Sequence, residues 1–383
     1  MKTFGGTGYE QANCIINTTD GDYLVVGNGT DFMGLAYKLN ISGGIIWKKG
    51  FDTKIQSVCN ANDNAYIVMG HIDRSVGNKA NSDVWLSKID SKGKTVWANT
   101  YGGSDLDESY MIINTLDNGH LFVGSTFSSD GDISINHGGR DVWVVKIGES
   151  GEIAWEKTYG GAGWEEAFCV KQLPDMSYVI VGKSDSYNDF QKGHFRNDFY
   201  IIKISNNGDL LKQKVYGSTG DDYGYSLALT DDNGIVIAGE VGWADGEVSA
   251  MHGDGGSDIW VIKTDQDLNL IWEKSYGGYT WDQEPYIIKK VTGVYTFACQ
   301  TTSNDGDVSG NHGQGDIWLV DINEQGNILN NRCFGGTGFD MPKSIITNSN
   351  GGIIVAGSSD SQDGDVTGNN GGNDFWIIST SVK

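Results

Sequence analysis

A dipeptide of one aromatic residue and one glycine recurs along the whole chain. Its copies stand at intervals of 47 to 60 residues and begin at Phe4, Phe51 (where the pattern is degenerate), Tyr101, Tyr159, Tyr216, Tyr276 and Phe334. Between copies the chain repeats one order of segments: an apolar run, a tight turn, a second run ending in glycine, a variable loop, and a third and fourth run. Self-similarity of this length is typical of repeat architectures, in which each copy is one supersecondary unit.

The runs within each unit have the character of short β-strands. In the third unit they read ESYMIINT, HLFVGS, DVWVVKI and IAWEKTYGG. Short β-branched and aromatic runs bounded by Gly, Asn and Asp predict antiparallel strands. With 3 Pro and 56 Gly, the composition also favours strands joined by glycine turns over helices. The sequence therefore predicts an all-β fold, a seven-bladed β-propeller of four-stranded antiparallel blades.

The two ends of the chain complete one unit between them. After Phe334 the last unit supplies three strands, and residues 1–4, MKTF, match the end of a fourth strand such as EKTY in residues 156–159. We expect the N-terminal strand to close the last blade, because closure removes an exposed sheet edge. We expect a single β-propeller domain over residues 1–383, with blades at approximately 5–51, 52–101, 102–159, 160–216, 217–276, 277–334, and 335–383 plus 1–4.

The repeat resembles the bacterial seven-bladed β-propeller repeat family, often called SBBP. The resemblance rests on YGGSDLDESY at Tyr101, YGGAGWEEAF at Tyr159, DNGIVIAGE at Asp232 and SDIWVIK at Ser257, and it covers the whole chain. It implies a propeller from a secreted or surface-displayed bacterial protein, and thus an extracellular or cell-surface location. The second unit departs from the pattern at KKGFDTKIQS, where the Gly-Gly loop is lost, and the first unit has Met33 where others have Asp.

The charge of the chain excludes several classes of partner. A formal charge of -23 and a pI near 4.4 disfavour nucleic acid and anionic membrane surfaces, since both would be repelled. The chain shows no run of 18 or more apolar residues and no basic, apolar leader, so we expect neither membrane insertion nor a signal peptide in this sequence. Its five cysteines show no close spacing and favour buried thiols. We expect a monomer that binds a glycan or a protein.

Residues that recur in every unit are interpreted first as structural. Tryptophans recur at one position of the third run and at one position of the fourth, where packing between blades explains them. Third-run lysines form a similar column, which an acidic protein can pair. An acid also follows the aromatic-Gly dipeptide at a fixed distance, and we expect it to accept backbone N–H groups at the entry to the first strand; these acids are Glu10, Asp107, Glu165, Asp222, Asp282 and Asp340.

Aromatic residues that the repeat does not require mark one face. Trp164, Trp243 and Trp281 lie outside the repeated columns, and Tyr9 and Phe339 stand at the position equivalent to Trp164 and Trp281. Up-and-down strands place all of these on the face that carries the long loops, where binding residues concentrate. With the neighbouring acids Glu165 and Asp282 they form our candidate ligand-binding set. Aromatic rings beside carboxylates suit sugar rings, and they suit a protein partner almost as well.

Three Asp-rich loops suggest calcium as a possible cofactor. DGDVSGNHGQGD at 305–316 places oxygen-bearing side chains at positions one, three, five and twelve with Gly at six, as in EF-hand loops. Asx turns are the competing interpretation, because the final Asp also recurs in units that lack the earlier acids. The candidate ligands are Asp130, Asp132, Asp141, Asp305, Asp307, Ser309, Asp316, Asp363, Asp365, Thr367 and Asp374.

The loop histidines do not favour a zinc site. They recur in four different units and would not converge on one ion; they are His137, His194, His252 and His312.

Two functions remain open from the sequence. The first is a non-catalytic ligand-binding propeller that recognises glycan or protein through the face bearing the long loops. The alternative is a propeller glycoside hydrolase or polysaccharide lyase, in which two acids on the same face act as the catalytic pair. The sequence indicates no specific catalytic residue, so we lean away from an enzyme without excluding one.

Overall fold

The computed structural model describes residues 1–74, 81–186, 196–253 and 255–380. In these ranges the chain forms seven four-stranded antiparallel sheets and a single 3-10 turn, η1 (Asn62–Asn64). The fold is therefore an all-β, seven-bladed β-propeller, which confirms the predicted fold class. Contacts divide the chain into two compact units, each made of several sheets and distinct from the repeat units of the sequence. Each compact unit is described by itself. The first unit comprises Met1–Ala12, Tyr187–Ile201 and Lys212–Lys383; the second comprises Asn13–Ser186 and Ile202–Leu211.

Three sheets belong to the first unit. They consist of β18 (Tyr223–Leu229), β19 (Ile235–Val241), β20 (Asp258–Thr264) and β21 (Leu270–Tyr276); of β22 (Asp282–Val291), β23 (Val294–Thr301), β24 (Asp316–Asn323) and β25 (Ile328–Phe334); and of β26 (Asp340–Thr347), β27 (Ile353–Ser359), β28 (Asp374–Ser379) and β1 (Lys2–Phe4).

The other four sheets begin in the second unit, apart from the first residues of β2. They consist of β2 (Glu10–Asn17), β3 (Tyr23–Gly29), β4 (Gly34–Leu39) and β5 (Ile45–Phe51); of β6 (Lys54–Asn60), β7 (Tyr66–Asp73), β8 (Ser82–Ile89) and β9 (Thr95–Tyr101); of β10 (Asp107–Asn114), β11 (His120–Thr126), β12 (Asp141–Ile147) and β13 (Ile153–Tyr159); and of β14 (Glu165–Gln172), β15 (Tyr178–Ser184), β16 (Asp198–Ile204) and β17 (Leu210–Tyr216).

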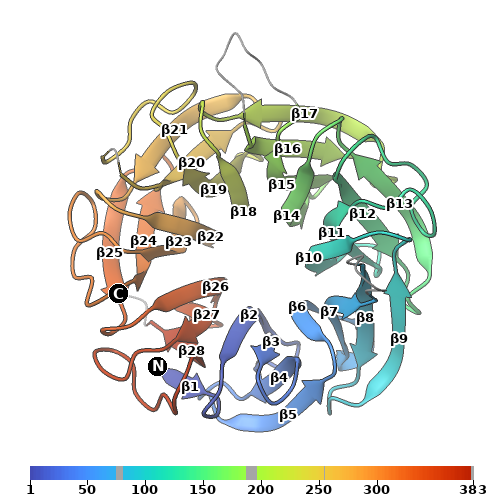
Figure 1. The fold of residues 1–383 in the computed structure, drawn as a ribbon, viewed down its shortest axis with the longest axis horizontal. Helices are drawn as coiled ribbons and strands as arrows, with labels where there is room; N and C mark the ends of the chain where they lie inside the picture. Colours follow the sequence, from blue (N-terminus) through green and yellow to red (C-terminus); the bar gives the residue numbers. More distant parts are fainter. Residues whose placement is uncertain (75–80, 187–195, 254, 381–383) are drawn as a thin grey trace. The chain divides into compact units, whose positions relative to one another are not determined.

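The N-terminal strand completes the last sheet, as the sequence predicted. β1 pairs antiparallel with β28, and Thr3 lies opposite Trp376. Figure 1 shows β1 beside β28, although the two strands stand at opposite ends of the chain. Without β1, the backbone of β28 would present an open edge.

The middle strands of each sheet are buried on both faces, whereas the fourth strand is partly exposed. Every residue of β11 and β12 is buried, while β13 alternates between half-buried and exposed positions. Strands buried on both faces read as continuous hydrophobic runs rather than as alternating ones. This explains why VWVV and its equivalents are continuous apolar runs in the sequence.

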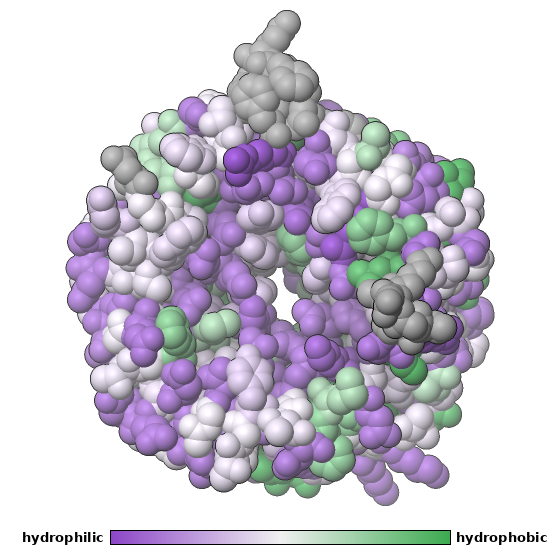
Figure 2. All heavy atoms as spheres, viewed as in Figure 1, coloured by the Kyte–Doolittle hydropathy of each residue, from purple (hydrophilic) through white to green (hydrophobic). Residues whose placement is uncertain are grey.

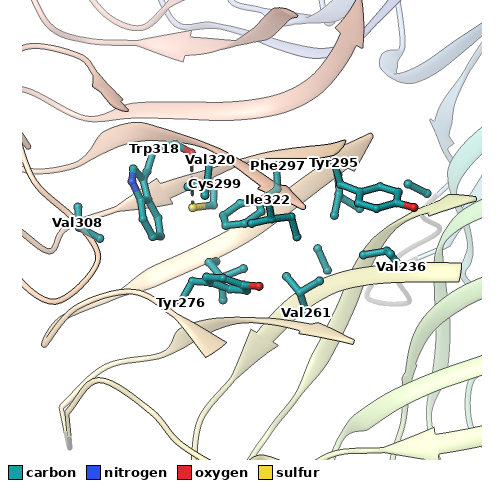
Figure 3. Close-up of a cluster of buried hydrophobic side chains, with 14 of the residues drawn as sticks. Val236, Val261, Tyr276, Tyr295, Phe297, Cys299, Val308, Trp318, Val320 and Ile322 are labelled. Atoms are coloured by element: carbon teal, nitrogen blue, oxygen red, sulfur yellow. Dashed lines mark hydrogen bonds between the residues drawn. The ribbon is translucent and has the colours of Figure 1, made fainter. Parts of the chain in front are cut away.

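The recurring aromatic residues hold neighbouring sheets together. In the first unit, Trp318 and Phe297 of one sheet pack with Tyr276 of the preceding sheet in a cluster of buried side chains (Figure 3). The Phe297 and Trp318 rings meet edge to face at 5.9 Å. The Tyr276 hydroxyl donates to the Gly326 carbonyl, 2.6 Å away in the next sheet. These contacts confirm that the aromatic columns serve packing between blades.

Two other repeated residue types also have structural roles. The third-strand lysines Lys146 and Lys263 form ion pairs with turn aspartates Asp117 and Asp232, at 2.7 and 2.9 Å. All five cysteines lie in described residues, and no disulfide joins them. Both observations agree with the structural interpretation of these residues.

Candidate functional site

Each sheet carries two of its loops at one end. Because the four strands alternate in direction, the loop before the first strand and the loop between the second and third strands lie at the same end. We call these the entry loop and the long loop, and the end that they share the loop end. In the β10–β13 sheet they cover residues 102–106 and 127–140.

The recurring acid at the start of the first strand holds the entry loop. In six sheets its carboxylate accepts the backbone N–H of the residue four positions earlier, for example Gly103 to Asp107 at 2.7 Å and Gly161 to Glu165 at 2.7 Å. The same bond forms at Glu10, Asp222, Asp282 and Asp340. The prediction of a backbone-holding acid is confirmed, and we call this group the brace carboxylate.

Two members of the predicted ligand-binding set are brace carboxylates. Glu165 and Asp282 are both fully buried. The Ser184 hydroxyl also donates to Glu165 at 2.8 Å, and the Ser303 hydroxyl donates to Asp282 at 3.0 Å. Neither carboxyl group is accessible to a ligand, so neither belongs to the candidate binding surface.

A second buried carboxyl group lies beside each brace carboxylate. It belongs to the Asp at the start of a third strand, and the pair encloses the first glycine of the entry loop. A Cβ built on Gly160 would lie 2.1 Å from Asp141 Oδ1 and 2.3 Å from Glu165 Oε2. Burial raises the pKa of Asp107 and of Asp282 to about 6, and that of Asp222 to about 7, because desolvation disfavours the charged form.

The first two acids of the Asp-rich loops already hold backbone groups. Asp130 Oδ1 accepts the Ser104 N–H at 2.7 Å, and Asp132 Oδ2 accepts the Gly102 N–H at 3.0 Å. Asp305 and Asp363 make the equivalent bond to their own entry loops, each at 2.7 Å. Each long loop is thus tied to the entry loop of its sheet, and these bonds join two loops rather than closing a local Asx turn.

The remaining candidate calcium ligands are not gathered around a common point. The final acids Asp141, Asp316 and Asp374 are fully buried, and each accepts a backbone N–H from its own loop. Asp307 lies 3.3 Å from a histidine nitrogen, and Asp365 pairs with an arginine. Ser309 is exposed, and the Thr367 carbonyl accepts the Thr3 hydroxyl.

Across the described residues, no group of three or more His, Cys, Asp or Glu side chains could hold a metal ion. Calcium binding by these loops therefore stays a prediction without such a cluster behind it.

The loop histidines are engaged separately. The Nδ1 atoms of His137, His252 and His312 lie 3.0, 2.9 and 2.6 Å from the buried third-strand aspartates of their own sheets. His194 lies outside the described residues. The three described histidines therefore support their own loops.

The predicted aromatic residues are exposed. Trp164, Trp243 and Trp281 expose 52, 62 and 52% of their surface, and Tyr9 and Phe339 expose 49 and 41%. Tyr279, in the same entry loop as Trp281, exposes 58%. The sequence analysis missed Tyr279, although it stands where other units have Thr, Ser or Ala, which was a usable signal.

The exposed aromatic residues stand on a backbone that is held in place. Trp164 N–H donates to Asp185 Oδ1 at 2.6 Å, and the Asp185 N–H returns a bond to the Trp164 carbonyl at 3.2 Å. Trp281 exchanges the same two bonds with Thr302, at 3.0 and 2.8 Å. Phe339 does so with Asp360. A fixed backbone lowers the entropy that a bound ligand must remove.

A buried charged cluster, which the sequence analysis missed, lies behind Trp164. Arg140 Nη1 lies 2.8 Å from Glu166 Oε1, and the Tyr110 hydroxyl donates to Glu166 Oε2 at 2.8 Å. The Trp164 ring meets Phe127 edge to face at 5.7 Å, and the Arg140 guanidinium lies over the Phe127 ring at 5.5 Å. The cluster makes a firm support for the exposed indole.

The first unit holds a comparable polar cluster around Glu240. The Tyr225 hydroxyl donates to Glu240 Oε1 at 3.3 Å, and burial raises the pKa of Glu240 to about 7. Glu240 stands directly after the last glycine of its second strand. That position is polar and different in most sheets, which was the available sequence signal; its residues are Asn28, His71, Ser125, Lys183, Glu240, Gln300 and Ser358.

The viewed surface is mostly hydrophilic. Figure 2 shows hydrophobic residues there in separate patches rather than in one continuous area. Among the described residues no helix is long and apolar enough to cross a membrane.

Comparison with known proteins shows the fold but no family. No family model matches the chain. The regulatory protein FlaEY of Caulobacter vibrioides is 26% identical over 200 residues, which are 49% of this chain and only 20% of FlaEY.

Among solved structures, the WD40 domain of Neurospora crassa Pan2 aligns with a TM-score of 0.56 at 10% identity, covering 97% of this chain and 90% of that one. BamB from Moraxella catarrhalis aligns with a TM-score of 0.47 at 13% identity, covering 97 and 99%. The similarity to Pan2 supports a β-propeller. Membership of the SBBP family remains a prediction.

Proposed function

We propose that this β-propeller is a non-catalytic binding module that recognises a neutral glycan through the aromatic side chains at its loop ends. The observation that carries the proposal is the pairing of exposed rings with a fixed backbone at Trp164, Trp281 and Phe339. The repeat does not require aromatic residues there, because Leu106 and Asp221 stand at the same position in two other sheets. Large exposed apolar groups on a rigid support favour recognition of a ligand.

The surroundings of these rings favour a glycan over a protein. The core of a protein interface is a closely packed and largely apolar patch, whereas Trp164 and Trp281 are each held by polar loop residues, Asp185 and Thr302. A single flat ring among polar groups suits a sugar, whose C–H face can stack while its hydroxyls find hydrogen-bonding partners. The charge of -23 further favours a neutral glycan over an anionic one.

The recurring acids do not support the alternative of a glycosidase or lyase. A glycosidase needs two carboxyl groups that reach the substrate, roughly 5–9.5 Å apart. The recurring acids at the loop ends are buried and hold backbone N–H groups instead. The geometry therefore supports binding better than catalysis by these residues.

Affinity electrophoresis in native gels that contain soluble xyloglucan, galactomannan or mixed-linkage β-glucan tests the proposal. We expect at least one polysaccharide to retard the protein, and Trp164→Ala or Trp281→Ala to weaken retardation about tenfold or more, as expected for loss of a central aromatic contact. Ile271→Ala is the matched control, since Ile271 is 55% exposed on β21. Equal mobility of all proteins with and without every polysaccharide would contradict the proposal.

We also propose that the protein acts as a monomer, and that it lies outside the cytoplasm, as the resemblance to SBBP propellers implies for its location. Fractionation of the producing cells with an antibody against the chain tests the location. Light scattering after size-exclusion chromatography tests the oligomeric state, with 41.5 kDa expected for one copy.

A further inference from the structure

In four sheets a serine of the long loop supports the brace carboxylate. Ser128 donates to Asp107 at 3.0 Å, and Ser303 and Ser361 make the equivalent bond at 3.0 and 2.9 Å. The same hydroxyl oxygens accept a backbone N–H of the entry loop, such as that of Asp105 at 2.9 Å. Ser186 takes this place beside Glu165. The serine thus joins the two loops at the loop end.

A glycine of the entry loop makes room for this serine. A Cβ built on Gly103 would lie 2.6 Å from the Cβ of Ser128. The equivalent distances are 2.7 Å at Gly161, 2.6 Å at Gly278 and 2.8 Å at Gly336. Carbon atoms of two side chains do not approach so closely, so only one of the two positions can point a side chain at the brace carboxylate.

In the β18–β21 sheet the serine stands in the entry loop instead of in the long loop. Ser218 stands where the four sheets above have glycine, and Trp243 stands where they have serine. Ser218 Oγ lies 2.9 Å from Asp222 Oδ2 and accepts the Gly220 N–H at 3.1 Å, so it takes over both bonds of the missing serine. Val241 accompanies the change, since it replaces a Thr or Ser whose hydroxyl also reaches the brace carboxylate elsewhere.

Because Ser218 makes the bonds to Asp222 and to the entry loop, the side chain of Trp243 does not have to fill the interior of the loop end. Its indole lies over Gly220, where a Cβ would be 2.1 Å from Trp243 Cδ1, and 62% of the residue is exposed. An indole left mostly in water gains little hydrophobic stabilisation. Folding therefore gives no reason for a tryptophan here, because the pattern of glycine and serine in four other sheets satisfies the brace carboxylate without one.

We infer that Trp243 is a ligand-contacting residue of the first unit, and that Ser218 is its positioning residue, which takes over the serine's bonds so that the indole can face solvent. The inference rests on the proposed glycan-binding function. It explains by that function why the β18–β21 sheet departs from the glycine and serine pattern of the repeat. Sheet β18–β21 has Asp221 where the other two sheets of the first unit have Trp281 and Phe339. Trp243 thus supplies, from the long loop, the aromatic group that this entry loop lacks.

Two sets of variants test the inference. Trp243→Ala keeps the Cβ that the loop already accommodates and removes only the indole. Ser218→Gly removes the hydroxyl from the buried Asp222, and the triple variant Ser218→Gly, Val241→Thr, Trp243→Ser rebuilds the pattern of the other sheets. Retardation in gels with xyloglucan, galactomannan or mixed-linkage β-glucan is measured for each, together with the melting temperature, and Ile271→Ala serves as control.

We expect Trp243→Ala and the triple variant to bind the retarding polysaccharide about tenfold or more weakly. We expect Ser218→Gly alone to melt lower than wild type, and the triple variant to regain that loss. Wild-type retardation with unchanged binding by Trp243→Ala would overturn the inference and leave the proposed function standing. A triple variant that melts no higher than Ser218→Gly would overturn the exchange itself. A wild type that no polysaccharide retards would overturn both proposals.

Discussion

Gly160 stands between two buried carboxyl groups, and the same arrangement surrounds Gly5, Gly217 and Gly335. The glycine is required for space rather than for an unusual backbone angle, since these four residues do not adopt a left-handed conformation. The repeat therefore requires glycine at this position, because any side chain would displace a carboxyl group that holds an entry loop.

Substitution of Gly160 by alanine measures how strongly this space is constrained. We expect Gly160→Ala to lower the free energy of unfolding by about 2–4 kcal/mol, because the added methyl group meets Asp141 and Glu165 at 2.1 and 2.3 Å. Gly6→Ala is the control, since a Cβ at Gly6 meets no atom within 4 Å. Denaturant unfolding would contradict the prediction if both variants lost equal stability.

The pairs of buried carboxyl groups give the loop ends a dependence on pH. Burial raises the pKa of Asp222 from 3.8 to about 7 and that of Asp107 to about 6. At these two carboxyl groups the folded chain therefore holds more protons than the unfolded chain, and their contribution to stability falls as the pH rises from 3.8 towards 7. Burial lowers the pKa of His71 and of His120 to about 4, so these two groups contribute with the opposite sign. The lowered pKa of Asp117, about 2, acts with the opposite sign and only below pH 3.8.

A variant that cannot titrate isolates one of these contributions. We expect the melting temperature of the wild type to fall between pH 4.5 and 7.5, and Asp222→Asn to fall less steeply. The asparagine keeps an acceptor for the Ser218 N–H but binds no proton. Melting curves across this interval decide the matter, and identical slopes for both proteins would contradict the assignment to Asp222.

How far the sequence could predict these elements depends on whether a residue repeats. The strand order, the aromatic columns and the brace carboxylates repeat at fixed spacing, so their roles followed from comparison of the units. The bond from the Ser218 hydroxyl to Asp222 has no copy in the other described sheets. It is explained by the limited space between the entry loop and the long loop, which the sequence separates by about 25 residues. Arg140 and Glu166 were missed for the same reason, because their contact joins two units of the repeat.

The fold as a whole also depends on one contact between its ends. β1 contributes only Lys2, Thr3 and Phe4 to the sheet, yet these residues cover the edge of β28. We expect removal of residues 1–4 to lower the melting temperature and to promote aggregation, because an uncovered strand edge pairs with other chains. Removal of Met1 alone is the control, since Met1 lies outside β1. Thermal melting followed by light scattering measures both effects, and equal behaviour of the two truncated chains would contradict the expectation.

The relation between Ser218 and Trp243 also suggests how new binding surfaces can be built on this scaffold. One hydroxyl group moves from one loop to the other, and the position that it leaves becomes available for any side chain that points outward. Gly336→Ser combined with Ser361→Trp would transfer the arrangement to the β26–β28 sheet, where the two Cβ positions are 2.8 Å apart. Each loop end then becomes an independently adjustable contact point, and a designer can change the number of aromatic groups without altering the packed strands beneath them.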